Sequence, residues 1–156
     1  MRDKTLPIAR SPYLFSYGTL LPQHAPSEIA AAAAGLRPVG KGAVRGLLYH
    51  LGSYPGAVLS ESTRRMIRGT VFRLPDNTDL LDQFDHYEGF DAGAPKSSLF
   101  VRKLHPVTLA GGRVLRCWVY VYNRNPGTAP LIADGRYRLP SSGKLRHRPV
   151  ATTSLR

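Results

Sequence analysis

Carboxylates are the residues of this sequence whose number and spacing first suggest chemistry. Six of the ten acidic residues fall within residues 76–91, in a chain that also carries 22 Lys and Arg. They recur at every third position, as Asp76, Asp79, Asp82, Asp85, Glu88 and Asp91. Grouped carboxylates can bind a metal ion, transfer protons, or cap and solvate a helix. The segment therefore has three possible roles, and its predicted helical geometry helps to separate them.

A shared metal site fits the spacing poorly. Each residue of an α-helix advances by about 100°, so residues three apart drift by about 60° at every step. Over the whole segment the carboxylates wind most of the way around the helix and cannot converge on one ion. The segment also lacks the ligand order and central glycine of a calcium loop, and no His or Cys cluster lies beside it at ligand spacing. We therefore expect no metal site here.

The first four acids have structural explanations. The recurrence of apolar residues at three and four positions predicts a helix over residues 77–87. Asp76 and Asp79 would lie at its start, where a carboxylate can cap the helix and complements the dipole. Asp82 and Asp85 are then ordinary helix-face acids or partners of nearby arginines.

Glu88 differs because it lies at or just beyond the C-terminal end of this helix, where the dipole disfavours an anion. Gly89 would stop the helix, and Tyr87 and Phe90 place apolar surface close to the carboxylate. A carboxylate in such surroundings tends to have a raised pKa, which suits proton transfer near neutral pH. Glu88 is therefore a candidate acid–base residue, and a carboxylate without a catalytic role is the alternative.

The second candidate is SYGTL, residues 16–20, which follows an apolar strand predicted over residues 13–17. A Gly-Thr turn at a strand end presents backbone N–H groups outward, where they can bind a carboxylate or a developing oxyanion. The alternative is a plain turn in which Gly18 takes a positive φ. The motif is short, so its weight depends on what lies near it in the fold.

The elements that must position these residues are short strands and two helices. Besides the helix over residues 77–87, a helix capped by Ser27 is predicted to close at Gly35. Strands are predicted over residues 13–17, 38–50 (with a bend or bulge), 66–74, 99–110 and 113–122, the last two joined by a Gly111-Gly112 hairpin. Residues 53–60 are predicted to form a turn followed by a short strand. Regular strand–helix alternation is missing. We therefore expect an α+β fold, a small mixed, mostly antiparallel β-barrel with a few flanking helices.

Composition limits the class of protein. The chain has 156 residues, enough for one domain with a real core, and no apolar run long enough to span a membrane. Its single cysteine, Cys117, excludes an internal disulfide and fits a reducing compartment, so we expect a cytoplasmic protein. Cys117 lies in an apolar run and is expected to be a buried strand residue rather than a nucleophile.

The positive charge is concentrated toward the C-terminus. Residues 135–156 carry six Lys or Arg and no acid, within a net charge of +12 for the chain. The segment has few large apolar residues, so we expect a partly ordered basic tail. A solvated tail is the simpler interpretation, and binding of nucleic acid or another acidic partner through this tail is the alternative. The oligomeric state is not indicated by the sequence.

Six blocks of sequence, in their order, resemble the gamma-glutamylcyclotransferase-like family, which includes the gamma-glutamylamine cyclotransferases. The blocks are SYGTL at 16–20, YPG at 54–56, RGTVFRL at 68–74, LDQFDHYEGF at 81–90, LFVRKLHPV at 99–107 and CWVYVYN at 117–123. The resemblance covers about residues 12–124, which we take as the domain. The order of the blocks is more specific than any one of them.

The resemblance implies a small β-barrel enzyme that releases 5-oxoproline from a small gamma-glutamyl amine or peptide. In that reaction the α-amine of the substrate attacks its own γ-carbonyl, and no metal or cofactor is needed. The family's loop motif matches Tyr17, Gly18, Thr19 and Leu20, whose backbone would bind the gamma-glutamyl group. The family's acid–base glutamate matches Glu88.

Three further residues bear on the substrate. Some family members have a tyrosine where this chain has Phe100, so the missing hydroxyl leaves the identity of the substrate open. Tyr54 is expected either to line the pocket or to be a turn residue packed on the barrel. Arg102 could bind a substrate carboxylate, but we expect it to form an ion pair with Asp85. The competing hypothesis is a non-catalytic module that binds a small molecule or nucleic acid on the same fold.

Overall fold

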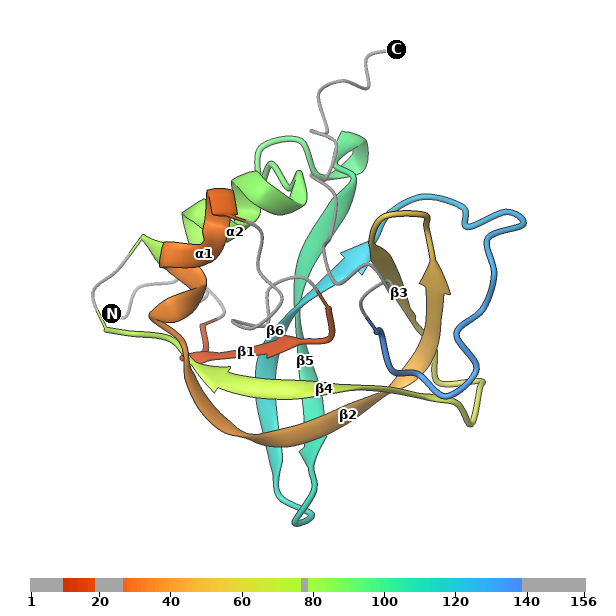
Figure 1. The fold of residues 1–156 in the computed structure, drawn as a ribbon, viewed down its shortest axis with the longest axis horizontal. Coiled ribbons are helices and arrows are strands. Elements are labelled where there is room, and N and C mark those ends of the chain that lie inside the picture. The colour runs from red at the N-terminus through yellow and green to blue at the C-terminus, as the bar shows by residue number, and fades with distance from the viewer. Residues whose placement is uncertain (1–9, 19–26, 77–78, 139–156) are drawn as a thin grey trace, which may run out of the picture.

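Six strands and two α-helices make up the described part of the chain. The computed structural model describes residues 10–18, 27–76 and 79–138. The elements, shown in Figure 1, are β1 (Tyr13–Ser16), α1 (Ser27–Ala34), β2 (Arg37–His50), β3 (Pro55–Leu59), β4 (Met66–Arg73), α2 (Leu80–Glu88), a 3-10 helix η1 (Pro95–Ser97), β5 (Phe100–Leu109) and β6 (Val114–Tyr122). The predicted strands and the Gly-Gly hairpin between the last two are confirmed, whereas η1 was not predicted.

The long strand β2 closes the barrel. The strand order is β3-β2-β4-β1-β6-β5, and β2 also pairs with β5 at Gly42↔Leu109, so five strands form a closed ring and β3 extends it. Along one edge β2 pairs first with β5 and then, from Gly46 onward, with β3. Among the described residues the β1–β6 pairing is parallel and the other strand pairings are antiparallel. The predicted mixed, mostly antiparallel barrel is therefore confirmed.

Side chains pack in two apolar clusters. One fills the barrel interior with residues such as Phe15, Ile67 and Val119. The other lies between the barrel wall and the helices and is built around Phe84 of α2 and Phe100 of β5, both fully buried. Figure 1 shows α1 and α2 together on one side of the barrel, so the second cluster joins them to the sheet.

The start of the second predicted helix was wrong. Helix α2 begins at Leu80, with Asp79 at the N-cap position but without a side-chain capping hydrogen bond. Asp76 does not cap the helix, because it lies four residues before Leu80; its side chain is 92% exposed and approaches Arg73 at 4.0 Å. Residues 77 and 78 lie outside the described residues. The predicted end of the helix at Gly89 is confirmed.

The segment after β6 returns to the barrel. The backbone N–H of Arg68 on β4 donates to the Gly135 carbonyl at 2.8 Å. Tyr137 is buried and packs in the interior cluster. The first residues of the segment predicted as a tail therefore contact the barrel, and residues 139–156 lie outside the described residues. Of the helices in the described ranges, none is long and apolar enough to cross a membrane.

Candidate functional site

A buried carboxylate occupies an apolar position on helix α2. The helix buries Leu80, Phe84 and Glu88, which are spaced four residues apart and therefore lie on the face that packs against the barrel. Glu88 is only 5% exposed. A glutamate is among the residues least often found fully buried, because burial disfavours charge. The amphipathic pattern would place an apolar side chain at this position, so Glu88 is the first candidate for chemistry.

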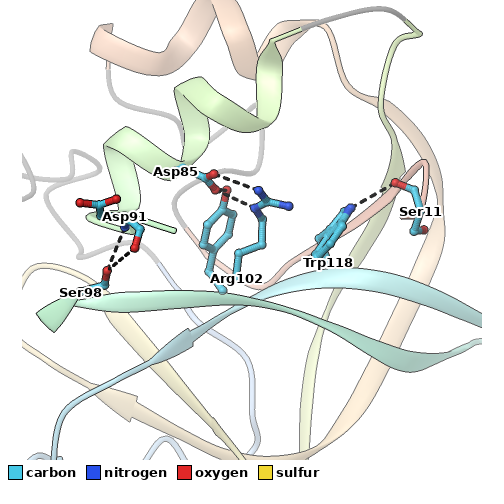
Figure 2. A network of polar contacts seen from close by, with 7 residues as sticks. Ser11, Asp85, Asp91, Ser98, Arg102 and Trp118 are labelled. Atoms are coloured by element: carbon cyan, nitrogen blue, oxygen red, sulfur yellow. Dashed lines mark hydrogen bonds and ion pairs between the residues drawn. The ribbon is translucent and has the colours of Figure 1, made fainter. Parts of the chain in front are cut away.

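The chain is fixed immediately after Glu88. Gly89 takes the left-handed conformation with φ 76° and ψ 34°, which glycine adopts without strain, and its N–H donates to the His86 carbonyl at 3.2 Å. The loop that follows is closed by the Leu99 N–H donating to the Gly89 carbonyl at 3.0 Å. The Asp91 N–H donates to Ser98 Oγ at 2.8 Å, as Figure 2 shows. Glu88 therefore sits at a defined helix end.

Asp85, one turn before Glu88, is held by two strands. Arg102 on β5 donates from Nε to Asp85 Oδ1 at 2.7 Å and from Nη2 to Oδ2 at 3.0 Å. The Tyr120 hydroxyl on β6 donates to Asp85 Oδ1 at 2.6 Å. The guanidinium lies 4.4 Å from the Trp118 ring centre, and Figure 2 shows Arg102 between Asp85 and Trp118. The predicted Asp85–Arg102 ion pair is confirmed.

The surroundings of Tyr120 and Arg102 raise the pKa values of both side chains. Burial, and then the charge and hydrogen bond of Asp85, raise the pKa of Tyr120 well above its ordinary value, and the charge of Glu88 raises it further. Burial lowers the pKa of Arg102, but the hydrogen bond and charge of Asp85 raise it overall. Tyr120 therefore remains protonated and able to donate a hydrogen bond at neutral pH. It also lies close enough to Glu88 for the charge of that carboxylate to affect its pKa.

Tyr17 and Gly18, which follow β1, are packed against the same end of the barrel. The Tyr17 hydroxyl donates to the Tyr120 carbonyl at 2.6 Å and accepts the Ala57 N–H at 3.3 Å. A Cβ on Gly18 would lie 2.6 Å from the Pro55 ring, which only glycine avoids. Gly18 is not among the described glycines with positive φ, so the alternative of a positive-φ turn was wrong. Thr19 and Leu20 lie outside the described residues.

Tyr54 and Phe100 are neighbours in the structure. Their ring centres are 6.1 Å apart, and Phe100 also contacts its cross-strand partner Tyr122 at 5.5 Å. Tyr54 is half-buried and Phe100 fully buried. A Cβ on Gly56, two residues after Tyr54, would lie 3.1 Å from Tyr122, so the start of β3 packs closely on β6. These rings form an apolar wall beside the strand ends.

The parallel pairing of β1 and β6 explains why these residues meet. Strands that run in the same direction end at the same edge, so Tyr17 after β1 lies beside Tyr120 near the end of β6. Asp85 then fixes the end of α2 over that edge. Tyr120 was not predicted as a site residue, because its alternating strand sequence gave no sign of its two partners. Within the described ranges no group of three or more His, Cys, Asp or Glu could hold a metal ion.

Comparisons with known proteins give a family and a fold. A sequence model described as "Gamma-glutamyl cyclotransferase, AIG2-like" matches residues 14–139. No curated protein matches the chain. Among solved structures, an AIG2-like protein from mouse shares 18% identity and a TM-score of 0.65, covering 88% of this chain and 95% of that one. Protein YtfP from Escherichia coli shares 25% identity and a TM-score of 0.57, covering 80% and 95%. An uncharacterised Pyrococcus horikoshii protein shares 14% identity and a TM-score of 0.52, covering 81% and 89%.

Proposed function

Because the chain belongs to the gamma-glutamyl cyclotransferase, AIG2-like family, we propose that it releases 5-oxoproline from a gamma-glutamyl amine or peptide. The observation that carries the proposal is the burial of Glu88 on the core-facing side of α2, at a helix end where an anion is disfavoured. Burial disfavours the charged form of a carboxylate, and a proton-transfer role gives a reason for placing one here. Glu88 is the proposed acid–base residue.

The reaction needs one group that first accepts and then donates a proton. Glu88 takes a proton from the α-ammonium of the substrate, and the resulting neutral amine attacks the γ-carbonyl to form the new C–N bond. The tetrahedral intermediate then collapses, Glu88 returns its proton to the leaving nitrogen, and the bond to that nitrogen breaks. The ring nitrogen gives up its second proton to the released amine, so the products are 5-oxoproline and the amine in its ammonium form. Attack within one molecule supplies proximity without a protein nucleophile.

The loop after β1 is the proposed binding element for the gamma-glutamyl group. The Tyr17 hydroxyl donates one hydrogen bond and accepts another, so the position of Tyr17 at the start of the loop is fixed. Backbone N–H groups of Gly18 and of the motif residues that follow it would stabilise the oxyanion of the intermediate. The rings of Tyr54 and Phe100 supply an apolar side to the site.

The proposal is tested with a panel of gamma-glutamyl amines and peptides, assayed for 5-oxoproline by mass spectrometry. Two matched control compounds sharpen the test: the α-linked isomer, and the N-acetylated gamma-glutamyl compound, whose amine cannot attack. We expect release from at least one gamma-linked compound and from neither control. Release from the acetylated compound would contradict the intramolecular attack. A folded protein that releases 5-oxoproline from none of the compounds would overturn the proposal and favour a non-catalytic binding module.

A further inference from the structure

Three residues that touch no part of the proposed reaction join the two halves of the site. We propose that Tyr120, together with Asp85 and Arg102, positions the carboxylate of Glu88 relative to Tyr17, which follows β1. This inference rests on the proposed function, and it adds residues whose role is geometric rather than catalytic. The three are called the Asp85 network below.

Two side chains, Arg102 and Tyr120, donate hydrogen bonds to the carboxylate of Asp85. Arg102 and Tyr120 are cross-strand partners, directly opposite each other on β5 and β6. Their side chains therefore leave the sheet side by side, and both reach Asp85 on α2, at 2.7 Å and 2.6 Å to Oδ1. A forked guanidinium–carboxylate contact allows only a narrow range of orientations. The C-terminal half of α2 is thus fixed against two adjacent strands.

Asp85 and Glu88 lie close together along α2. Residues three apart on a helix are neighbours on its surface, so Asp85 and Glu88 belong to the same final turn of α2. The last turn of a helix lacks intrahelical partners for its carbonyls and frays unless something holds it. In α2 the Gly89 cap holds the backbone, and the Asp85 network holds the side-chain face. Both restrict the orientation of Glu88.

Tyr120 makes two hydrogen bonds, one through its hydroxyl and one through its backbone carbonyl. Its hydroxyl donates to Asp85 on the helix, and its backbone carbonyl accepts the Tyr17 hydroxyl at the start of the loop. One residue therefore contacts the helix that carries the acid–base group and the loop proposed to bind substrate. Loss of the Tyr120 hydroxyl would remove the hydrogen bond between Tyr120 and helix α2. Strand β6 and the hydrogen bond from Tyr17 to the Tyr120 carbonyl would remain.

Arg102 also provides a spectroscopic signal. The chain has one tryptophan, and the guanidinium of Arg102 lies 4.4 Å from the centre of the Trp118 ring. The indole N–H donates to the Ser11 carbonyl at 3.1 Å, so the ring itself is anchored (Figure 2). Trp118 fluorescence therefore reports on the position of Arg102, independently of any turnover.

The test compares the Tyr120→Phe variant with wild type and with Asp82→Asn, which changes an exposed carboxylate on the same helix. Steady-state kinetics of 5-oxoproline release are measured beside circular dichroism and Trp118 emission. Misplacement of a reacting group by about 1 Å can cost 10²-fold in rate. We expect Tyr120→Phe to lower kcat by about 10- to 100-fold with KM changed less than about 3-fold. Asp82→Asn should keep wild-type kinetics and emission.

Each outcome has a distinct meaning. A wild-type kcat in folded Tyr120→Phe, beside an active wild-type enzyme, would overturn the positioning role alone. An equal loss of kcat in Asp82→Asn would do the same, because the effect would then be general to the helix. If Tyr120→Phe fails to fold, Arg102→Lys, which retains the charge but not the fork, carries the same comparison of kcat and Trp118 emission. An inactive wild-type protein would overturn the proposed function and this inference together.

Discussion

Breaking the Asp85–Arg102 ion pair should be strongly destabilising, because the partner left behind would be a largely buried, uncompensated charge. Its side chains are 14% and 16% exposed, and two hydrogen bonds run between them. A hydrogen bond to a charged group contributes about 1.5–3 kcal/mol, and breaking a buried pair costs about 3–5 kcal/mol. We expect Arg102→Met to lower the free energy of unfolding by about 3 kcal/mol, because Asp85 loses its charge partner while remaining largely buried.

A double-mutant cycle measures the pairwise part of this energy. Arg102→Met, Asp85→Asn and the double variant are unfolded in urea and followed by circular dichroism. Trp118 emission is not used, because the Arg102 guanidinium lies 4.4 Å from the Trp118 ring and its loss would be expected to change the emission directly. We expect a coupling energy of at least about 1.5 kcal/mol, with the double variant less destabilised than the sum of the single variants.

The chain offers a matched control in Asp134 and Arg138. Their closest approach is also 2.7 Å, but their side chains are 49% and 65% exposed. Solvent screens such a surface pair, so the same cycle there should show no measurable coupling. Equal coupling in the two pairs would refute the reasoning from burial. Additive effects at Asp85 and Arg102, within about 0.5 kcal/mol, would refute the claim that they act as a pair.

Three further outcomes are expected. Burial and Asp85 raise the pKa of Tyr120 in the folded protein, whereas an unfolded tyrosine titrates near pH 10. Its contribution is complete below about pH 10 and lost above it, so wild-type unfolding free energy should fall more steeply from pH 10 to 11 than that of Tyr120→Phe; parallel curves in urea titrations would contradict this. Burial raises the pKa of Cys117 to about 12, so a thiol reagent at pH 8 should label it only in denaturant, and rapid native labelling would count against its burial. Gly18→Ala should destabilise the fold by about 1–3 kcal/mol in urea unfolding, since its Cβ would lie 2.6 Å from Pro55, and a neutral effect would show that the ring can move.

Local patterns in the sequence predicted much of the fold. Alternation of apolar residues gave each strand to within a few residues, and the glycines after β5 gave the hairpin. Gly89 marked the end of α2 because glycine alone adopts its left-handed conformation readily. The Asp85–Arg102 pair was predictable because opposite charges with apolar neighbours tend to meet. These features depend on nearby residues or on charge.

The contacts between residues far apart in the sequence could not be predicted from such patterns. The closure of the barrel by β2 and β5 depends on a pairing between residues more than 60 positions apart, which periodicity does not encode. The start of α2 was misplaced because Asp76 and Asp79 are equally good capping residues by type. The contact of Tyr120 with Tyr17 follows from the parallel β1–β6 pairing, and its contact with Asp85 follows from the packing of α2 on the sheet. Only the assembled fold reveals either contact.

The most direct test of the central claim is the rate of 5-oxoproline release by Glu88→Gln, measured beside wild type and Asp82→Asn. The substitution keeps the size of the buried side chain and removes its ability to exchange a proton. Acid–base groups contribute about 10²–10⁴-fold to rate, so Glu88→Gln should lose at least about 10²-fold while its circular dichroism stays native. Asp82→Asn should retain the wild-type rate. Release by folded Glu88→Gln at the wild-type rate would contradict the assignment of Glu88 as the acid–base residue.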